Sequence, residues 1–397
     1  MNAAATGATG ASTITSANMG ANTSKTMSTT PVAPGGVRYR MIDALRGIAC
    51  LAVVFYHAKE GGHLAALVAA APAWFGQLLA HGDSGVAIFF AISGFVIAHS
   101  VLRDEVTGGY VGRFLLRRSL RLDPPYWAAI ALALAAAWLS ARAVPGKTFA
   151  MPDAGNLLLH ITYLVDLAGA PLINPVYWTL CVEIQFYVSF VLLMWGAGAL
   201  RARLGAERAL DVVLTASALV AALWVTPWAP FHMHGLFLER WYLFIGGVLA
   251  WRAVHGGQRR HMVAALANCA LLALVLGLYS TSSHDLVGLA TLLLVLVCGR
   301  LGWLASVGGG PLLQWLGLIS YSLYLTHNTI TGAAFRVGYR LTGRSAATEA
   351  LWLALVVVAC CLFAWLFYRV FERAGLRWSK LVPLHRPARP VAGTAGA

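Results

Sequence analysis

The chain has 397 residues, of which 59% are hydrophobic and only 11% charged. About a quarter of the residues are charged in a soluble globular domain, so the composition excludes that class and predicts an integral membrane protein. The net charge of +14 comes from basic residues spread over many short segments, which excludes a compact basic domain for nucleic-acid binding. The six cysteines lie in apolar stretches without metal-ligand spacing, so we expect neither a disulfide framework nor a metal site.

Residues 1–37 consist mainly of Ala, Thr, Ser, Gly and Asn, and we expect them to form a disordered cytoplasmic tail. Ten hydrophobic stretches follow, each long enough to cross about 30 Å of hydrocarbon. A shorter apolar stretch, 156–167, lies between two prolines and is expected to be re-entrant or interfacial. The ten predicted spans are 42–60, 83–102, 124–141, 177–198, 209–226, 234–254, 262–280, 285–305, 312–335 and 348–371.

The fold class that these stretches predict is all-α, a polytopic membrane helix bundle of about ten transmembrane helices. An even number of spans puts both termini on one side of the membrane. Because Lys and Arg gather in alternate loops, the positive-inside rule predicts that both termini are cytoplasmic. Residues 38–373 then form one transmembrane domain, and residues 374–397 form a basic C-terminal tail.

The first predicted span carries a cation near one end, Arg46, and an imidazole near the other, His57. The two residues are eleven positions apart, so on a helix they differ by only about 20° in direction and lie about 16 Å apart along the axis. They therefore share a face. A charged side chain within a membrane span indicates a functional site. The alternative is that Arg46 reaches the lipid headgroups and His57 caps the other end of the span.

Polar residues of the predicted spans fall into two layers. Arg46 lies at the cytoplasmic level, close to the basic cluster Arg117, Arg118 and Arg121 before the third span. Guanidinium groups have forked donors that match phosphate oxygens, so this layer predicts a site for a polyanion. The alternative is an ordinary cytoplasmic loop with anionic lipid bound.

Acid and base groups gather at the opposite level, around His57. Asp83 and Glu183 are the carboxylates that could orient its imidazole through a hydrogen bond, and the sequence does not decide between them. The candidates for binding an acceptor at this level are Trp178, Tyr321 and His327.

The separation of the layers suits a donor that is long and carries phosphates at one end only. A pantetheine arm is roughly as long as the three helical turns between Arg46 and His57, and it ends in a thioester. With the phosphates held by arginines, the thioester would lie near His57, and an imidazole can accept a proton from an attacking hydroxyl at neutral pH. In the second span, the Ser93 hydroxyl is expected to line the donor cavity.

Several short motifs follow one another along the chain: Arg46 with ten residues before His57, FFAISGF at Phe89–Phe95, RRSLRLDPPYW at Arg117–Trp127, WTLCVEIQFY at Trp178–Tyr187, SYSLYLTH at Ser320–His327 and FER at Phe371–Arg373. Their order resembles that of the acyltransferase-3 family of bacterial membrane enzymes, which acylate sugars of lipopolysaccharides, capsules, exopolysaccharides and some macrolide antibiotics. The resemblance implies that His57 is the catalytic histidine and that acyl-CoA is the donor. It also implies that Arg46 and the pair Arg118 and Arg121 are functional.

We therefore predict an O-acyltransferase that moves an acyl group, expected to be acetyl from acetyl-CoA, to a hydroxyl of a cell-surface carbohydrate. His57 would act as the general base, either with direct transfer or through a transient acyl-histidine. The resemblance implies a multi-pass protein of the bacterial inner (cytoplasmic) membrane that meets its carbohydrate acceptor on the extracytoplasmic side. The sequence leaves open whether the protein forms a homo-oligomer, and no nucleic acid is expected as a partner.

An alternative of another class is a proton-coupled secondary transporter of a small sugar or metabolite, because intramembrane Arg, Glu and His also occur in such proteins. The sequence has no internal symmetry and no matching pairs of interrupted spans, and both features are typical of transporters. The enzyme is the prediction that these patterns favour.

Overall fold

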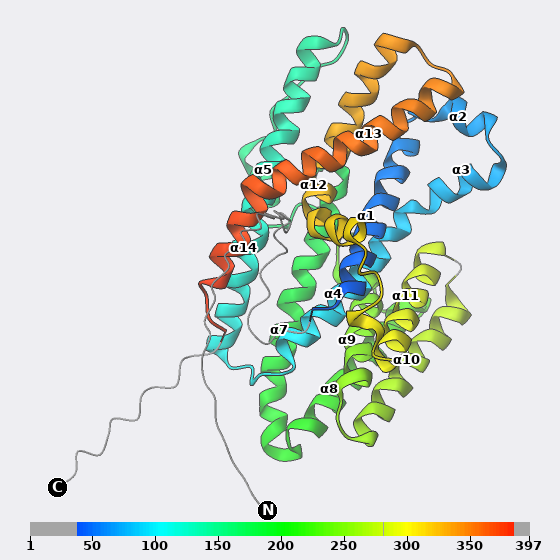
Figure 1. Cartoon of the computed structure of the whole chain (residues 1–397). Helices are drawn as coiled ribbons and strands as arrows, with labels where there is room; N and C mark the ends of the chain where they lie inside the picture. Colours follow the sequence, from blue (N-terminus) through cyan, green and yellow to red (C-terminus); the bar gives the residue numbers. More distant parts are fainter. Residues whose placement is uncertain (1–37, 281, 385–397) are drawn as a thin grey trace, which may run out of the picture. The chain divides into compact units, whose positions relative to one another are not determined.

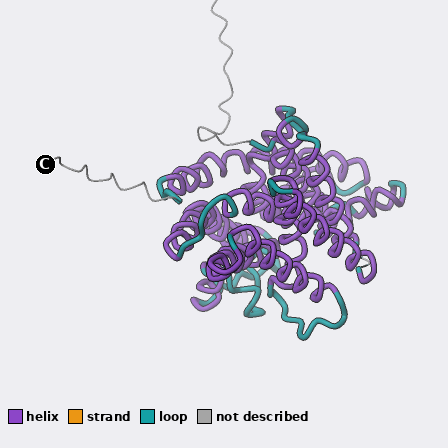
Figure 2. Tube along the Cα trace, turned by 90° about the horizontal axis from the view of Figure 1, so that it is seen from below, coloured by secondary structure: helices purple, strands orange, loops and turns teal. Residues whose placement is uncertain are grey.

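The computed structural model describes residues 38–280 and 282–384, and every regular element within them is helical (Figure 2). The all-α prediction is therefore confirmed for this part of the chain. The predicted tail 1–37 lies outside the described residues, as does the end of the predicted C-terminal tail, 385–397.

The elements are mostly long helices joined by short connections, labelled in Figure 1. The long helices are α1 (Arg40–Glu60), α4 (Gly85–Val101), α5 (Gly108–Ala143), α7 (Trp178–Leu204), α8 (Ala206–Val225), α9 (Trp241–His255), α10 (Arg259–Tyr279), α11 (Ser283–Arg300), α12 (Pro311–Thr342) and α13 (Ala346–Phe367). The shorter elements are α2 (Ala65–Ala70), α3 (Ala73–Ala80), η1 (His81–Ser84), α6 (Ala154–Ile161), η2 (Pro175–Tyr177), η3 (Phe237–Arg240), η4 (Trp303–Ala305), the π-helical η5 (Tyr368–Glu372) and α14 (Arg373–Lys380).

Eight helical segments of the described chain are long and apolar enough to cross a membrane. They confirm a polytopic membrane protein, while the count of ten spans and the common side of the two termini stay predictions. The eight segments are Arg40–Glu60, Ala73–Val101, Gly108–Ala143, Pro175–Leu204, Ala206–Val225, Arg259–Tyr279, Ser283–Arg300 and Ala346–Lys380.

Two predicted spans, 234–254 and 312–335, correspond to helices outside this set. α9 has only 15 residues and residues 241–253 are all buried, so its apolar sequence reflects contact with protein on every side. α12 has 32 residues but is rich in buried hydroxyl and imidazole side chains, which reduce its hydropathy. These buried polar residues are Ser320, Tyr321, Ser322, Tyr324, Thr326, His327 and Thr331.

The helix α5 begins earlier than the sequence predicted. The third predicted span began at a proline pair and left the arginine cluster in a loop, whereas the structure has this cluster on the helix. Pro124 and Pro125 lack the N–H groups that would bond the carbonyls of Leu120 and Arg121. Gly375 of α14 packs directly against those carbonyls, since a Cβ built on it would lie 2.7 Å from Leu120 O. This contact covers the carbonyls that the prolines leave unpaired, and α5 continues through them.

The contact between α1 and α12 is the most extensive in the structure (Figure 1). It is close because Gly317 has no side chain: a Cβ there would lie 2.2 Å from Asp43 O of α1. α4 contacts α1 and α7, and α5 contacts α7 and α12. These five helices therefore surround a common space, which holds most of the predicted site.

Candidate active site

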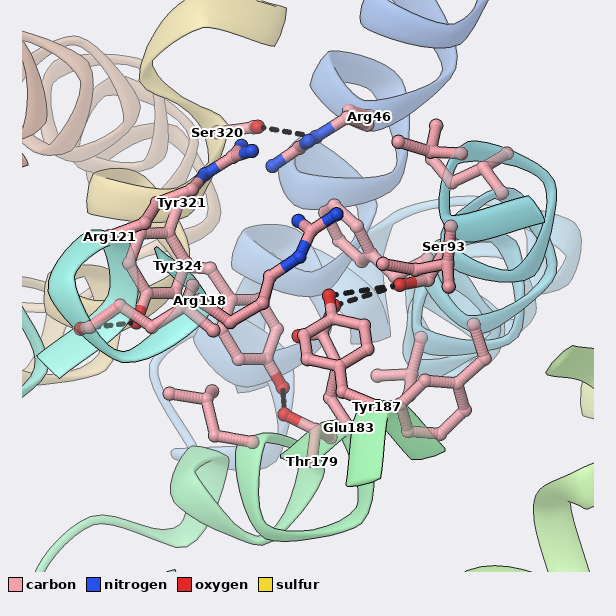
Figure 3. A pocket seen from close by; sticks show the side chains of 18 residues that line it. Arg46, Ser93, Arg118, Arg121, Thr179, Glu183, Tyr187, Ser320, Tyr321 and Tyr324 are labelled. Atoms are coloured by element: carbon pink, nitrogen blue, oxygen red, sulfur yellow. Dashed lines mark hydrogen bonds between the residues drawn. The ribbon is translucent and has the colours of Figure 1, made fainter. Parts of the chain in front are cut away.

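A pocket lies between α1, α4, α5, α7 and α12, and its walls enclose about 840 Å³ when the open mouth is included (Figure 3). We call it the arginine pocket. Its polar lining consists of Arg46, Ser93, Arg118, Arg121, Thr179, Glu183, Tyr187, Ser320, Tyr321 and Tyr324.

Three guanidinium groups converge at one side of the arginine pocket (Figure 3). Arg46 donates from Nε to Ser320 Oγ of α12 at 3.3 Å. The Arg118 guanidinium lies 5.2 Å from the ring centres of both Phe114 and Tyr187, which is cation–π geometry. Arg121 follows one helical turn later. Like charges gathered in this way favour an anionic ligand with several oxygens.

The fourth predicted arginine, Arg117, is not among the residues that line this pocket. It precedes Arg118 on α5, and neighbouring residues on a helix differ by about 100° in direction. The sequence analysis could not distinguish the direction of Arg117 from that of Arg118, because it expected the cluster in a loop.

Opposite the guanidinium groups, Glu183 of α7 forms a compact hydrogen-bonded group with α4. Its carboxylate accepts from Ser93 Oγ at 2.9 Å and from the Tyr187 hydroxyl, and these two hydroxyls lie 3.1 Å apart. Glu183 therefore belongs to the arginine pocket, where one carboxylate faces three guanidinium groups. In the described residues, its hydrogen bonds do not include His57.

The imidazole of His57 packs against that of His327, with 5.2 Å between the ring centres. Because His57 and Arg46 both contact α12, they share a face of α1, as the sequence predicted. His327 is fully buried, and its Nδ1 lies 3.1 Å from Leu323 O and 2.9 Å from Tyr324 O. Carbonyl oxygens only accept, so Nδ1 carries the proton and a neutral ring has Nε2 as an acceptor. That Nε2 is buried and has no hydrogen-bond partner among the described residues.

The remaining predicted site residues make no hydrogen bond to the His57–His327 pair among the described residues, although Asp83 lies within Coulomb range of His57. Asp83 is in η1, where Ser84 Oγ lies 3.4 Å from its carboxylate, and in the described chain it makes no hydrogen bond to His57. Tyr321 lines the arginine pocket, but its hydroxyl donates to Leu122 O at 3.0 Å. Trp178 lies outside the arginine pocket and forms part of the wall of a second pocket.

The sequence analysis missed three residues that complete this region. Thr179 and Tyr324 join α7 to α12 through hydroxyls 2.8 Å apart. Glu372 of η5 is buried, accepts from Ser322 Oγ at 2.6 Å, and lies within Coulomb range of Arg46 and Arg121. The helical spacing of Ser320, Tyr324 and His327 predicts that Tyr324 lies on the same side of the helix as the other two, although no role in the site was assigned to it. Nothing in the sequence showed that the glutamate would turn inward.

No group of three or more His, Cys, Asp or Glu side chains within residues 38–280 and 282–384 has the arrangement of a metal site.

Comparisons with known proteins match most of the chain. A family model described as an acyltransferase domain, acyltransferase 3, matches residues 39–369. BcsY of Komagataeibacter xylinus, named as a membrane-bound transacylase, is 28% identical over 367 residues, which cover 87% of this chain and 85% of BcsY. Protein 2 of the picA locus of Rhizobium radiobacter is 31% identical over 178 residues, 41% of this chain and 84% of that protein.

A further relative is YrhL of Bacillus subtilis, named as a peptidoglycan O-acetyltransferase. It is 26% identical over 388 residues, which cover 87% of this chain and 57% of YrhL. No solved structure matches the chain.

Proposed function

The chain belongs to the acyltransferase-3 family, and from that premise we propose that this acyl-transferring membrane enzyme takes its acyl group, expected to be acetyl, from acyl-CoA. The acceptor is a hydroxyl group of a carbohydrate. Two relatives named as a transacylase and as a peptidoglycan O-acetyltransferase support transfer to an acceptor of this kind.

One observation carries the donor assignment: Arg46, Arg118 and Arg121 converge in a pocket that has a single carboxylate in its lining. A guanidinium is always charged near neutral pH, and three of them at close quarters repel one another. The phosphate groups of a coenzyme A thioester would relieve this repulsion and accept several forked hydrogen bonds.

The position of His57 supports the rest of the assignment. The contact between α1 and α12 runs from Arg46 and Ser320 to His57 and His327, so a guanidinium and an imidazole lie along one helix contact. The rise of an α-helix separates the two by about 16 Å, which suits a pantetheine arm. A donor anchored at the arginines would then present its thioester carbonyl near His57.

The reaction is a balanced acyl transfer. The acceptor oxygen bonds to the thioester carbonyl carbon while His57 removes the hydroxyl proton, the C–S bond breaks, and the proton passes to the departing thiolate. For this step one ring nitrogen of His57 must be free of its proton. We assign to His327 the role of fixing the tautomer of His57: its Nε2, which has no hydrogen-bond partner among the described residues, would accept an N–H from the other nitrogen when the two rings come within hydrogen-bond distance.

We further propose that the enzyme resides in the bacterial inner membrane with both termini in the cytoplasm, so that the donor enters at the level of Arg46 and the acceptor at the level of His57. The distribution of Lys and Arg between the predicted loops supports this orientation.

The test combines binding and transfer in protein purified into nanodiscs. Coenzyme A should stabilise the wild-type protein against heat, because a ligand that binds only the folded state raises its stability. In a strain that lacks the native enzyme, the wild-type gene should restore acyl groups on cell-surface glycan, and the His57→Ala variant should not. Unchanged acyl incorporation in His57→Ala cells would refute the proposal, as would a wild-type protein indifferent to coenzyme A.

A further inference from the structure

A second pocket lies on the other side of the first turns of α7 and encloses about 720 Å³ with its open mouth. We call it the Trp178 pocket. Its chemistry differs from that of the arginine pocket, because it is lined by two carboxylates, one guanidinium, one imidazole and an indole. These groups belong to Asp166, Glu239, Arg240, His234 and Trp178.

Two hydrogen bonds from Gln185 of α7 hold the wall of the Trp178 pocket in place. Gln185 donates from Nε2 to Gly235 O at 2.8 Å and accepts from Phe237 N at 3.2 Å. Gly235 has φ +75°, and a Cβ on it would lie 2.6 Å from Asp166 O. Only glycine fits at this position, so the segment before α9 is fixed against the segment before η2. The pocket is thus preformed, as binding sites usually are.

Asp166 is unusual within this pocket. It is only 4% exposed, and among the described residues its carboxylate approaches only His234 Nδ1, which at 3.8 Å is too far for a hydrogen bond. Burial raises the pKa of the Asp166 carboxyl, because removal from water disfavours the charged form. Asp166 lines the Trp178 pocket, so a hydroxyl donor of a bound ligand can reach its carboxylate.

The other groups indicate which ligand would bring that donor. The Trp178 ring is half-buried and meets Phe90 edge to face, with 6.3 Å between the ring centres, so its indole forms a fixed apolar wall. Carboxylates accept hydrogen bonds from hydroxyl groups, and an aromatic wall packs against the C–H groups of a sugar ring. A phosphorylated ligand would meet two carboxylates here, so the pocket favours a neutral saccharide.

The Trp178 pocket lies at the same level of the helices as His57. Trp178 precedes Thr179, whose hydroxyl is 2.8 Å from that of Tyr324. The Tyr324 ring in turn lies 5.9 Å from that of His327, the partner of His57. A saccharide in the Trp178 pocket would therefore sit beside the end of the donor path.

We propose that the Trp178 pocket binds one ring of a neutral saccharide acceptor, with Trp178 stacking on the ring and Asp166 and Glu239 accepting its hydroxyls. The ring bound there neighbours the one that is acylated. This assignment rests on the proposed function, since it names the part of the enzyme that recognises the acceptor.

The experiment uses the full-length protein in nanodiscs with two neutral tetrasaccharides, cellotetraose and chitotetraose. Binding is measured by isothermal titration calorimetry, and transfer is measured from acetyl-CoA to the same sugars. At least one of the two sugars should bind the wild type, and the Trp178→Ala and Glu239→Gln variants should weaken binding and raise the acceptor KM by about tenfold or more, the loss expected when a main contact is removed. The KM for acetyl-CoA should change much less.

Matched controls lie outside the pocket. Trp228→Ala removes an exposed tryptophan of the same connecting segment, and Glu105→Gln neutralises an exposed acid elsewhere, so both should bind sugar as the wild type does. Asp166→Asn adds a readout of stability. If Asp166 serves binding, this variant should lose sugar affinity while its resistance to heat is equal to or greater than that of the wild type.

Two results would overturn the inference: wild-type protein that transfers acetyl groups but binds neither sugar, and Trp178 and Glu239 variants that keep the wild-type acceptor KM. A failure of the proposed function looks different, because the wild type would then neither transfer acetyl groups nor respond to coenzyme A. An Asp166→Asn variant that unfolds at lower temperature and keeps its sugar affinity would also contradict the inference.

Discussion

The arginine pocket and the Trp178 pocket occupy neighbouring faces of one helix, α7, and have opposite electrostatic character. In the arginine pocket three guanidinium groups face one carboxylate, whereas in the Trp178 pocket two carboxylates face one guanidinium and one imidazole. Residues of the first turns of α7 alternate between the two pockets: Trp178 and Val182 line one, and Thr179 and Glu183 line the other.

This difference teaches how a single membrane bundle can hold two unlike substrates close together. Under the two proposals, charge selects the ligand of each pocket, since a polyphosphate would be attracted to the first and repelled by the carboxylates of the second. The helix α7 lies between the two pockets, and under the proposed function both ligands must reach the His57–His327 pair, which lines neither pocket. The following predictions test whether the two pockets bind different substrates.

The largest effect should come from His57→Ala, which removes the base and leaves both pockets unchanged. Acetyl transfer should fall by about a hundredfold to ten-thousandfold, the usual contribution of a general base. Coenzyme A and sugar affinities, measured by calorimetry, should stay near those of the wild type. The control is His81→Ala, at an exposed histidine of the same end of α1 and α4. Equal loss in both variants would show that His57 has no special role.

The next effect concerns the arginine pocket alone. Arg118→Gln should weaken coenzyme A binding by about tenfold to a hundredfold, because hydrogen bonds between charged groups contribute about 1.5–3 kcal/mol each. Arg117→Gln is the matched control, since Arg117 carries the same charge and does not line the pocket. The measurement is the dissociation constant of coenzyme A for each of the two variants. Equal weakening in both variants would favour a diffuse attraction of the kind that a basic loop provides.

The role assigned to His327 predicts a smaller and more specific effect. Gln can place an amide oxygen near the position of Nε2, whereas Asn reaches only the position of Nδ1. His327→Gln should therefore keep more activity than His327→Asn, and the difference should appear in kcat and in the pH profile rather than in the KM for either substrate. If the two variants were equally impaired at every pH, His327 would contribute packing alone.

The smallest effect is that of ionic strength. The KM for acetyl-CoA should rise several-fold between low salt and about 0.5 M salt, because screening shortens the range of attraction to the guanidinium groups. The acceptor KM for a neutral tetrasaccharide should hardly change. Parallel dependence of both constants on salt would contradict the separation of the two pockets by charge.

Much of the fold and part of the site followed from the sequence. Hydrophobic length predicted a polytopic helical bundle, and the spacing of Arg46 and His57 predicted their common face, because helical geometry alone fixes both. Whether α9 and α12 are spans stays a prediction: α9 is apolar and surrounded by protein, and the polar residues of α12 face the interior. Hydropathy measures transfer to an apolar phase and does not distinguish lipid from protein.

The parts that the sequence could not provide depend on tertiary contacts. Glu183 was one of two carboxylates that the sequence allowed as the partner of His57, but it accepts a hydrogen bond from Ser93 of α4, and no pattern within α7 encodes that partner. The continuation of α5 through two prolines depends on Gly375, which is distant in the chain. Glu239 of the Trp178 pocket lies between α8 and α9 and Asp166 lies between α6 and η2, and Gln185 of α7 holds the backbone of the segment that carries Glu239.

The close contact of Gly317 with the backbone of α1 has a consequence for the choice of donor. A side chain at this position would push α12 away from α1. The close contact therefore fixes the interval between the Arg46 guanidinium and the His57 imidazole. Thioesters whose pantetheine arm matches that interval would transfer their acyl group. A pantetheine analogue lengthened by two methylenes should bind as tightly as coenzyme A derivatives and react more slowly, since its carbonyl would overshoot the imidazole.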